Sequence, residues 1–239
     1  MDGSDDNEVE IRSPHTIEEM TAVSEVLRQI WGSTKVIVSV ELMRAVEHAG
    51  GYVAAAFVAD NMVGASFGFL ARHEGRPALH SHITGILPGV QHAGVGRAMK
   101  SHQRAWAAAN DIEWVTWTFD PIVRRNAWFN IEVLGARLSD YLPDFYGSMS
   151  DAVNAEDESD RVLCAWPVDP SVDDPRPAGP TERIEIATPE DIVMLRRTDP
   201  AAAQAWRRRV REELGSALAA GAIVTGFTRE GSYILEKPV

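Results

Sequence analysis

The chain has 239 residues, 45% of them hydrophobic and 24% charged, which is typical of a globular protein. Its formal net charge of -12 argues against a nucleic-acid partner, because phosphate binding needs a basic face, and suits cationic small molecules. No apolar run reaches the roughly 18 residues of a membrane span, so we expect no membrane partner. The single cysteine, Cys164, fits a reducing compartment and favours a cytoplasmic protein.

The first seventy residues predict a strand, two helices and a hairpin. Residues 1–8 are acidic and lack the apolar stretch of a signal peptide, so we expect a disordered tail. A capping-box pattern begins the first helix at Thr16, with Glu19 three residues further on. The predicted elements are a strand at 9–11, a helix from 16 to 32, a helix ending at 50, and strands at 52–58 and 62–70.

The middle of the chain predicts a strand, a helix, a further strand and helix, and two closing strands. In order they lie at 79–87, 94–110, 113–119, 120–134, 137–146 and 161–168. Asp120 and Pro121 match an N-cap followed by proline at the first helical position. As an alternative, Asp120 at a strand end could bind a substrate ammonium ion, but the cap is the favoured interpretation.

A linker and a C-terminal extension follow. Residues 169–182 contain four prolines and no apolar periodicity, which predicts a linker. Residues 183–239 predict a strand, two helices capped by residues 188–191 and Asp199, and a hairpin. The same order of elements opens the chain, so the extension is interpreted either as a degenerate half-repeat or as an ordinary addition. Its WRRRVR run, Trp206–Arg211, is expected to be a solvated helix face rather than an anion site.

The segment LPGVQHAGVGRAMK, Leu87–Lys100, places three glycines between a predicted strand and a predicted helix. A Walker loop is excluded because the residues after Gly94 lack its lysine and hydroxyl, and a dinucleotide fingerprint because Met99 stands at its third glycine. Successive N–H groups at a helix start favour an anion site, to which Arg97 and Lys100 add positive charge. A tight turn with glycines for packing is the alternative.

The run P-x-x-Q-x-x-G-x-G, Pro88–Gly96, resembles the acyl-CoA pyrophosphate loop of the GNAT acetyltransferase superfamily. The order of predicted elements over residues 9–168 resembles that family too, and Leu134–Ala136 resembles the end of its late helix. The resemblance implies an α/β fold of GNAT type for residues 9–168, with a mixed, mostly antiparallel central sheet flanked by helices. Residues 183–239 would then form a smaller α/β extension.

The resemblance also implies a site for acetyl-CoA or another acyl-CoA as cosubstrate, and no metal. Backbone groups of Ile86 and Leu87 would meet the pantetheine arm and the thioester carbonyl. Asn126, or Asn130 one turn on, would contact the pantetheine arm from the other side, unless it is a surface polar residue of its helix. Backbone N–H groups of the loop would bind the pyrophosphate, and the loop residues are Gln91, His92, Ala93, Gly94, Val95, Gly96 and Arg97.

His80 and His82 are the candidate general bases. Residues two apart in a strand face the same side, so both imidazoles should point into one space ahead of the loop. An unperturbed pKa near 6.5 suits a histidine to remove a proton from an ammonium ion. The H-x-H spacing resembles the arylalkylamine branch of the superfamily, in which the histidines act through water. Core histidines are the alternative; a metal site is disfavoured because no acidic or thiol residue nearby completes it.

The general acid for the leaving thiolate is less well defined. In the superfamily a tyrosine commonly lies four residues before the terminal glycine of the late helix, and Ile131 stands at that position here. Tyr146 is assigned as the replacement, with Tyr141 as the other candidate. A thiolate can also leave without a proton and take one from water.

These expectations describe an N-acyltransferase that moves an acetyl or succinyl-like group from CoA to the amino group of a small amine or amino acid. Transfer would occur in a ternary complex, with no covalent intermediate on Cys164, which we expect to be a buried small hydrophobe. The alternatives are a non-catalytic acyl-CoA-binding or interaction protein and a protein-lysine acyltransferase. A homodimer is one candidate assembly.

Overall fold

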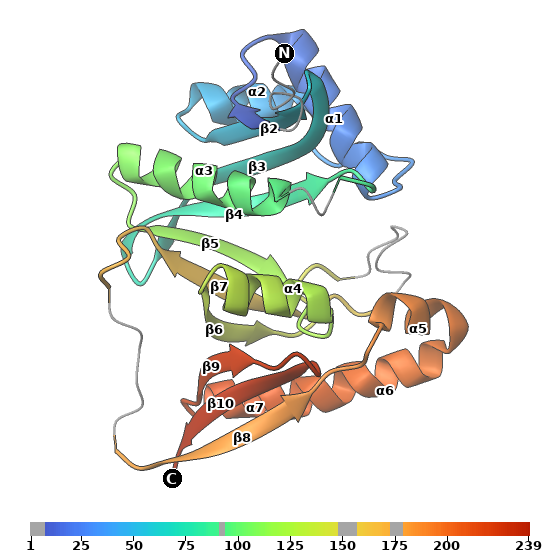
Figure 1. The fold of residues 1–239 in the computed structure, drawn as a ribbon, viewed down its shortest axis with the longest axis vertical. Coiled ribbons are helices and arrows are strands. Elements are labelled where there is room, and N and C mark those ends of the chain that lie inside the picture. The colour runs from blue at the N-terminus through green and yellow to red at the C-terminus, as the bar shows by residue number, and fades with distance from the viewer. Residues whose placement is uncertain (1–7, 91–93, 148–156, 173–178) are drawn as a thin grey trace, which may run out of the picture. The chain divides into compact units, whose positions relative to one another are not determined.

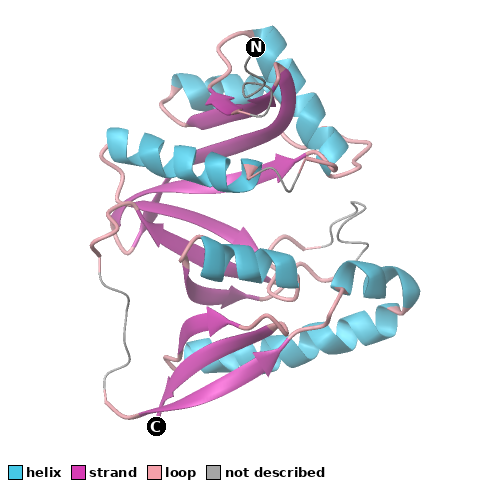
Figure 2. Cartoon of the chain, in the orientation of Figure 1, coloured by secondary structure: helices cyan, strands magenta, loops and turns pink. Residues whose placement is uncertain are grey.

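The computed structural model describes residues 8–90, 94–147, 157–172 and 179–239 (Figures 1 and 2). The chain divides into two compact units, residues 1–116 and residues 117–239, and each is described by itself. Within the described ranges, the helices are all too short or too polar to cross a membrane.

The first unit is a sheet with helices on both faces. Its strands follow the order β1-β2-β3-β4-β5, in which β4 and β5 are parallel and the other neighbours antiparallel. In chain order, its elements are β1 (Val9–Arg12), α1 (Ile17–Ile30), α2 (Val40–His48), β2 (Tyr52–Val58), β3 (Asn61–His73), β4 (Arg76–Ile86), α3 (Val95–Ala109) and the first half of β5 (Trp114–Phe119).

Local signals set several of these boundaries. Helix α1 starts with the predicted capping box, in which the Thr16 hydroxyl accepts from the Glu19 N–H and the Glu19 carboxylate accepts from the Thr16 N–H. The β2–β3 hairpin turns at Ala59 and Asp60, which both have positive φ. These elements match the sequence prediction within a few residues.

The two faces of this sheet are packed differently. On one face, α1 buries Met20, Val23 and Leu27 against strand residues that include Phe67. A second cluster joins Val95 and Met99 of α3 to Ala56 and Val63 of the strands. Alternate side chains of β4 therefore face the α1 side and the α3 side of the sheet, so its polar residues lie in two different surroundings.

The second unit holds the rest of β5, two more strands of the same sheet, and a separate three-stranded sheet. The strand orders are β5-β7-β6 and β8-β10-β9. Its elements are α4 (Arg124–Trp128), a π-helical turn (Phe129–Val133), β6 (Arg137–Leu142), β7 (Arg161–Pro167), β8 (Thr181–Ala187), α5 (Ile192–Thr198), α6 (Pro200–Val210), a π-helical turn (Arg211–Gly215), α7 (Ser216–Ala219), β9 (Ile223–Phe227) and β10 (Ser232–Pro238).

The compact units divide in the middle of β5, whereas the sequence analysis placed the boundary in the proline-rich segment 169–182. The C-terminal extension bonds directly to the segment after β5. Tyr233 donates to the Pro121 carbonyl at 2.6 Å, and the Phe227 N–H donates to the Glu132 carboxylate at 2.6 Å. The extension therefore shares a packed interior with the last part of the predicted acyltransferase domain.

The order of elements in the extension is the one predicted, but its strand pairing differs from that of the first seventy residues. Strand β1 pairs with β2, the first strand of its hairpin. Strand β8 instead pairs with β10, the second strand of the corresponding hairpin. The half-repeat stays a prediction, and this difference in pairing weighs against it.

Two predicted boundaries are wrong. Helix α4 begins at Arg124 and not at Asp120, whose carboxylate accepts only locally from the Ile122 N–H and is otherwise bound by arginines described below. Strand β6 ends at Leu142 rather than at 146. Within the predicted cap 188–191, Asp191 is the residue that caps α5, and the Thr188 hydroxyl donates to the Gly231 carbonyl.

Candidate active site

Strand β4 contains a β-bulge at the predicted base position. Phe67 on β3 pairs with Ile83, and the next residue, Gly68, pairs with Ser81, so His82 is the extra residue. A bulge bends its strand and re-aims a side chain. It can keep His82 on the face that His80 already occupies.

Ring contacts show that the two imidazoles share this face. Their centroids lie 6.5 Å apart, and the Phe69 ring lies 5.2 Å from His80 and 5.7 Å from His82. Phe67 contacts His82 edge to face at 6.3 Å. The two-residue spacing therefore predicts the geometry of the pair correctly, while its role in proton transfer stays a prediction.

The surroundings keep both histidines neutral near pH 7. Burial, the neighbouring His82 and the Lys100 charge lower the pKa of His80 to about 4, and Nδ1 of His80 lies 3.1 Å from the Thr116 hydroxyl. Burial also lowers the pKa of His82, whose side chain is more exposed. Because a base works best with a pKa near the working pH, His82 is the better candidate base and His80 the better hydrogen-bond partner.

The opposite face of β4 carries a buried polar network that the sequence analysis did not find. Gln103 donates from Nε2 to Ser66 at 2.6 Å, to Ser81 at 2.9 Å and to Thr84 at 3.2 Å. Lys100 donates from Nζ to Ser81 at 3.1 Å and to Gln103 Oε1 at 3.0 Å. Lys100 is only 5% exposed, so its predicted role as a positive charge at the helix start is wrong.

The strand-to-helix connection ends in an uncapped helix start. Gly94 is the N-cap residue of α3, with φ of +76°, and no side chain of the described residues accepts from the first turn. A Cβ on Gly94 would meet nothing within 4 Å, so the space beside it is open. Arg97 is exposed one turn in. N–H groups at a helix start can bind anions, and the contact with the CoA diphosphate stays a prediction.

Two further observations concern the predicted acyl-CoA residues. Ile86 ends β4, and the Leu87 N–H is already used, donating to the Val63 carbonyl at 2.8 Å. Within the first unit, the parallel ladder between β4 and β5 runs from the pair Ala78 and Trp114 to the pair His80 and Thr116. Gln91, His92 and Ala93 lie outside the described residues.

No protein-family model and no curated protein sequence matches the chain, but solved structures do. A proposed acetyltransferase of Salmonella typhimurium, solved with acetyl-CoA, is 15% identical; the match covers 69% of this chain and 96% of the other, with a TM-score of 0.53. An acetyltransferase assigned to the GNAT family, from Desulfovibrio desulfuricans, is 17% identical over 68% of this chain and 100% of the other, at 0.50.

A ribosomal-protein alanine N-acetyltransferase from Escherichia coli is 13% identical over 67% of this chain and 94% of the other, with a TM-score of 0.52. The chain has the GNAT fold. The fold predicted from the glycine loop and the element order is thereby confirmed, and a smaller extension with its own sheet is present as expected.

The remaining predicted residues belong to the second unit of this GNAT fold. Asn126 is partly buried on α4, and Asn130 is buried in the π-helical turn, where its Oδ1 accepts from the Trp117 indole at 3.3 Å. This bond makes Asn126 the more available of the two amides. Both contacts to the pantetheine arm stay predictions.

The two candidate tyrosines differ in their surroundings. Tyr141 donates to Asp160 at 2.7 Å, and burial followed by this carboxylate raises its pKa. Tyr146 is exposed, its hydroxyl lies 3.1 Å from that of Thr118, and the Arg161 guanidinium lies 5.3 Å from its ring centroid. An acid must release its proton, so these surroundings favour Tyr146 over Tyr141.

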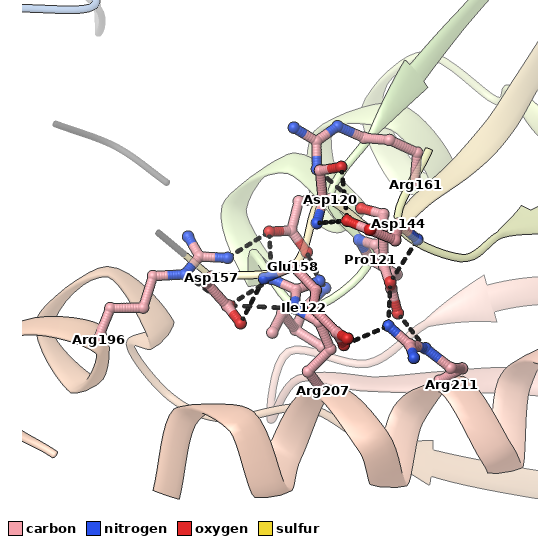
Figure 3. Close-up of polar contacts among 12 residues, drawn as sticks. Asp120, Pro121, Ile122, Asp144, Asp157, Glu158, Arg161, Arg196, Arg207 and Arg211 are labelled. Atoms are coloured by element: carbon pink, nitrogen blue, oxygen red, sulfur yellow. Dashed lines mark hydrogen bonds and ion pairs between the residues drawn. The ribbon is translucent and has the colours of Figure 1, made fainter. Parts of the chain in front are cut away.

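Four buried charged residues of the second unit, Asp120, Asp157, Arg196 and Arg207, form a cluster, which we call the arginine–aspartate cluster (Figure 3). Arg207 donates to Asp157 at 2.7 Å and to Asp120 at 3.0 Å. Arg196 donates to Asp120 at 2.5 Å and to Asp157 at 3.0 Å. Each arginine thus bridges both carboxylates.

This cluster corrects two interpretations of the sequence. Arg207 is 1% exposed, so the expectation that the WRRRVR run is a solvated face is wrong for this residue. Burial acts to raise the pKa of Asp120, but Arg207 and then Arg196 outweigh it and hold the pKa below its usual value. Asp120 is therefore ionised, and its charge is balanced by the two arginines. This makes it a structural residue rather than a site for a substrate ammonium ion.

A second ion pair lies beside the cluster in the same close-up (Figure 3). Arg211 donates to Asp160 at 2.5 and 2.9 Å and to Glu158 at 2.6 Å. Asp160 also accepts from the Asp144 N–H at 2.9 Å. The start of β7 is thus bound to the helix of the extension through charged side chains.

Proposed function

We propose that the chain is an acyl-CoA-dependent N-acyltransferase that moves an acetyl or succinyl-like group to the amino group of a small amine or amino acid. The observation that carries the proposal is the bulged strand β4. It holds two neutral imidazoles on one face, and the next element of the chain is α3, whose start at Gly94 has no side-chain cap among the described residues. Neutral imidazoles can accept a proton, and the helix start can bind the diphosphate of CoA.

The proposed reaction uses residues of this chain in the following way. His82, through a water molecule, takes a proton from the substrate ammonium ion, and His80 holds that water in place. The amine nitrogen then bonds to the thioester carbon, and the backbone N–H near Ile86 stabilises the oxyanion. As the C–N bond forms, the nitrogen gives its second proton to water, and as the C–S bond breaks the thiolate leaves and takes a proton from water.

The acceptor class is proposed from the charge of the chain. A net charge of -12 favours a cationic acceptor such as a free amine. The similar solved structures include a ribosomal-protein alanine N-acetyltransferase, so a peptide amine is the second acceptor to test. A small-amine acceptor, a cytoplasmic location and a homodimer stay predictions.

Thiol release from acetyl-CoA and succinyl-CoA tests the proposal, with a panel of amines, amino acids and N-terminal peptides as acceptors. Calorimetry measures acyl-CoA binding on the same samples. Turnover on at least one acceptor would support the proposal. Binding without turnover on any acceptor would instead favour a non-catalytic acyl-CoA-binding protein, which Ile131 at the usual tyrosine position already makes the main rival.

Gly94→Ala should weaken acyl-CoA binding by at least about tenfold, because an L-residue at φ of +76° costs roughly 1–2 kcal/mol and would move the helix start. Gly75→Ala is the matched control, since Gly75 in the β3–β4 turn also has φ of +76° and open space around its Cβ position. Calorimetry compares the two variants. Equal affinity in both would show that the glycine loop does not bind the diphosphate.

A further inference from the structure

The bulge in β4 lies across a buried polar network on α3. Ser81 precedes the extra residue His82, and Thr84 follows the next pair, so the two hydroxyls flank the bulge. Both accept from the same Gln103 amide. Gln103 is fully buried, which fixes the amide in one place.

This amide also reaches the neighbouring strand. Gln103 donates to Ser66 on β3 at 2.6 Å, and Ser66 in turn donates to the Ile83 carbonyl at 3.2 Å. Ser66 and Thr84 hydroxyls lie 2.8 Å apart. A bulge interrupts the ladder hydrogen bonds, so these side-chain bonds supply an alternative tether between the two strands at the point of interruption.

Lys100 extends the network with a buried ammonium group. Burying an ammonium ion is costly unless it is well hydrogen-bonded, and Lys100 bonds to the Ser81 hydroxyl and to Gln103. A leucine at this position of α3 would fill the same space without that cost. The ammonium group therefore points to a role in the site that β4 carries.

We propose that Gln103 and Lys100 are positioning residues for the histidine pair: they hold β4 in the bulged register that sets the position of His82 relative to His80. The inference rests on the proposed acyl transfer and adds two residues that touch neither cosubstrate nor acceptor. Gln103 acts through Ser81 and Thr84 on the backbone of the bulge. Lys100 acts through Ser81 and through its charge.

The charge of Lys100 opposes protonation of His80. The groups against His80 on β3 and β5 are Phe69 and Thr116, which carry no charge, and its own strand contributes His82. The other ionisable groups of these strands, Arg72, His73 and Arg76, with Glu113 before β5, lie at the far end near the β3–β4 turn. On α1, Glu25 pairs with Arg28. Lys100 is thus the cation of α3 that lowers the pKa of His80.

Two variants of Lys100 test the effect of its charge on His80. Lys100→Met removes the charge and keeps the length, and the His80 imidazole should then titrate at higher pH, because loss of a nearby cation stabilises the imidazolium. Lys100→Arg keeps the charge and should restore the wild-type titration. Proton NMR of the imidazoles measures this directly, and the acid limb of kcat/KM against pH should shift in the same direction.

Gln103→Leu removes the tether and keeps the Lys100 charge. We expect kcat to fall at least about tenfold with the KM for acyl-CoA unchanged, since a small misplacement of a catalytic group costs rate rather than binding. The imidazole titration should stay close to that of the wild type. Gln204→Leu, at an exposed position of α6, is the control for the substitution itself.

Unchanged imidazole titration in Lys100→Met would overturn the charge effect, and unchanged kcat in Gln103→Leu would overturn the tether. Circular dichroism checks that each variant folds, and Lys100→Gln replaces the methionine variant if that one does not. The NMR titration needs no turnover. If the wild type shows no acyl transfer, the proposed function fails, while the titration still decides whether Lys100 controls His80.

Discussion

Replacing His80 and His82 together by alanine is expected to lower kcat/KM for acyl transfer by at least about 100-fold, the usual contribution of a general base. Acyl-CoA affinity should stay within about twofold, because neither imidazole belongs to the glycine-led helix start. Thiol-release kinetics and calorimetry measure the two quantities. His48→Ala, an exposed histidine of α2, is the control and should behave as the wild type.

The single variants and the pH profile make this prediction sharper. His82→Ala should cost more than His80→Ala, since His80 has a pKa of about 4 and is the poorer base. Lowered pKa values leave both imidazoles neutral below their ordinary value of 6.5, so activity should persist below pH 6.5 and disappear only as the pH approaches the pKa of His82. Full activity in the double variant would show that another group takes the proton.

Arg207→Met is expected to lower the free energy of unfolding by about 3–5 kcal/mol, because it leaves two buried carboxylates short of a positive charge. Urea denaturation measures this value. Arg209→Met is the matched control on the same helix: Arg209 is exposed and pairs with Glu213 four residues on, so its loss should cost no more than about 0.5 kcal/mol.

A second substitution tests whether charge is the cause. Adding Asp120→Asn to Arg207→Met leaves one arginine and one carboxylate, and should recover part of the lost stability. If the double variant is less stable than Arg207→Met alone, the cluster acts through packing and not through charge balance. Equal stability of the Arg207 and Arg209 variants would show that the arginine–aspartate cluster does not stabilise the second unit.

Sequence analysis succeeds where a short local signal decides the structure. The Thr16 capping box and the Asp199 cap followed by Pro200 each determine a helix start through residues that are close in sequence. Two-residue periodicity likewise places His80 and His82 on one face. The glycine-led start of α3 is a third local signal, since Gly94 adopts the positive φ that a glycine allows.

Prediction from a local pattern fails where partners distant in sequence determine the contacts of a residue. Asp120 has the local pattern of a helix cap, but its carboxylate is bound by arginines 76 and 87 residues further along the chain. Arg207 looked solvated within a run of arginines. Its place in the buried row with Ala203 and Val210, at helical spacing, is a signal that could have identified it. The position of the bulge at His82 also involves a distant partner, because Gln103 of α3 bonds to Ser81 and Thr84 on either side of it.

The arginine–aspartate cluster makes the C-terminal extension an integral part of the fold rather than an appendage. Cleaving the chain within the proline-rich segment 169–182 would break one covalent connection and leave untouched the ion pairs that bind Arg196 and Arg207 to Asp120 and Asp157. The two fragments should therefore elute together on gel filtration. A protein shortened after residue 168 would instead keep both histidines and the glycine loop but leave Asp120 and Asp157 without their arginine partners, and a loss of stability is the expected result.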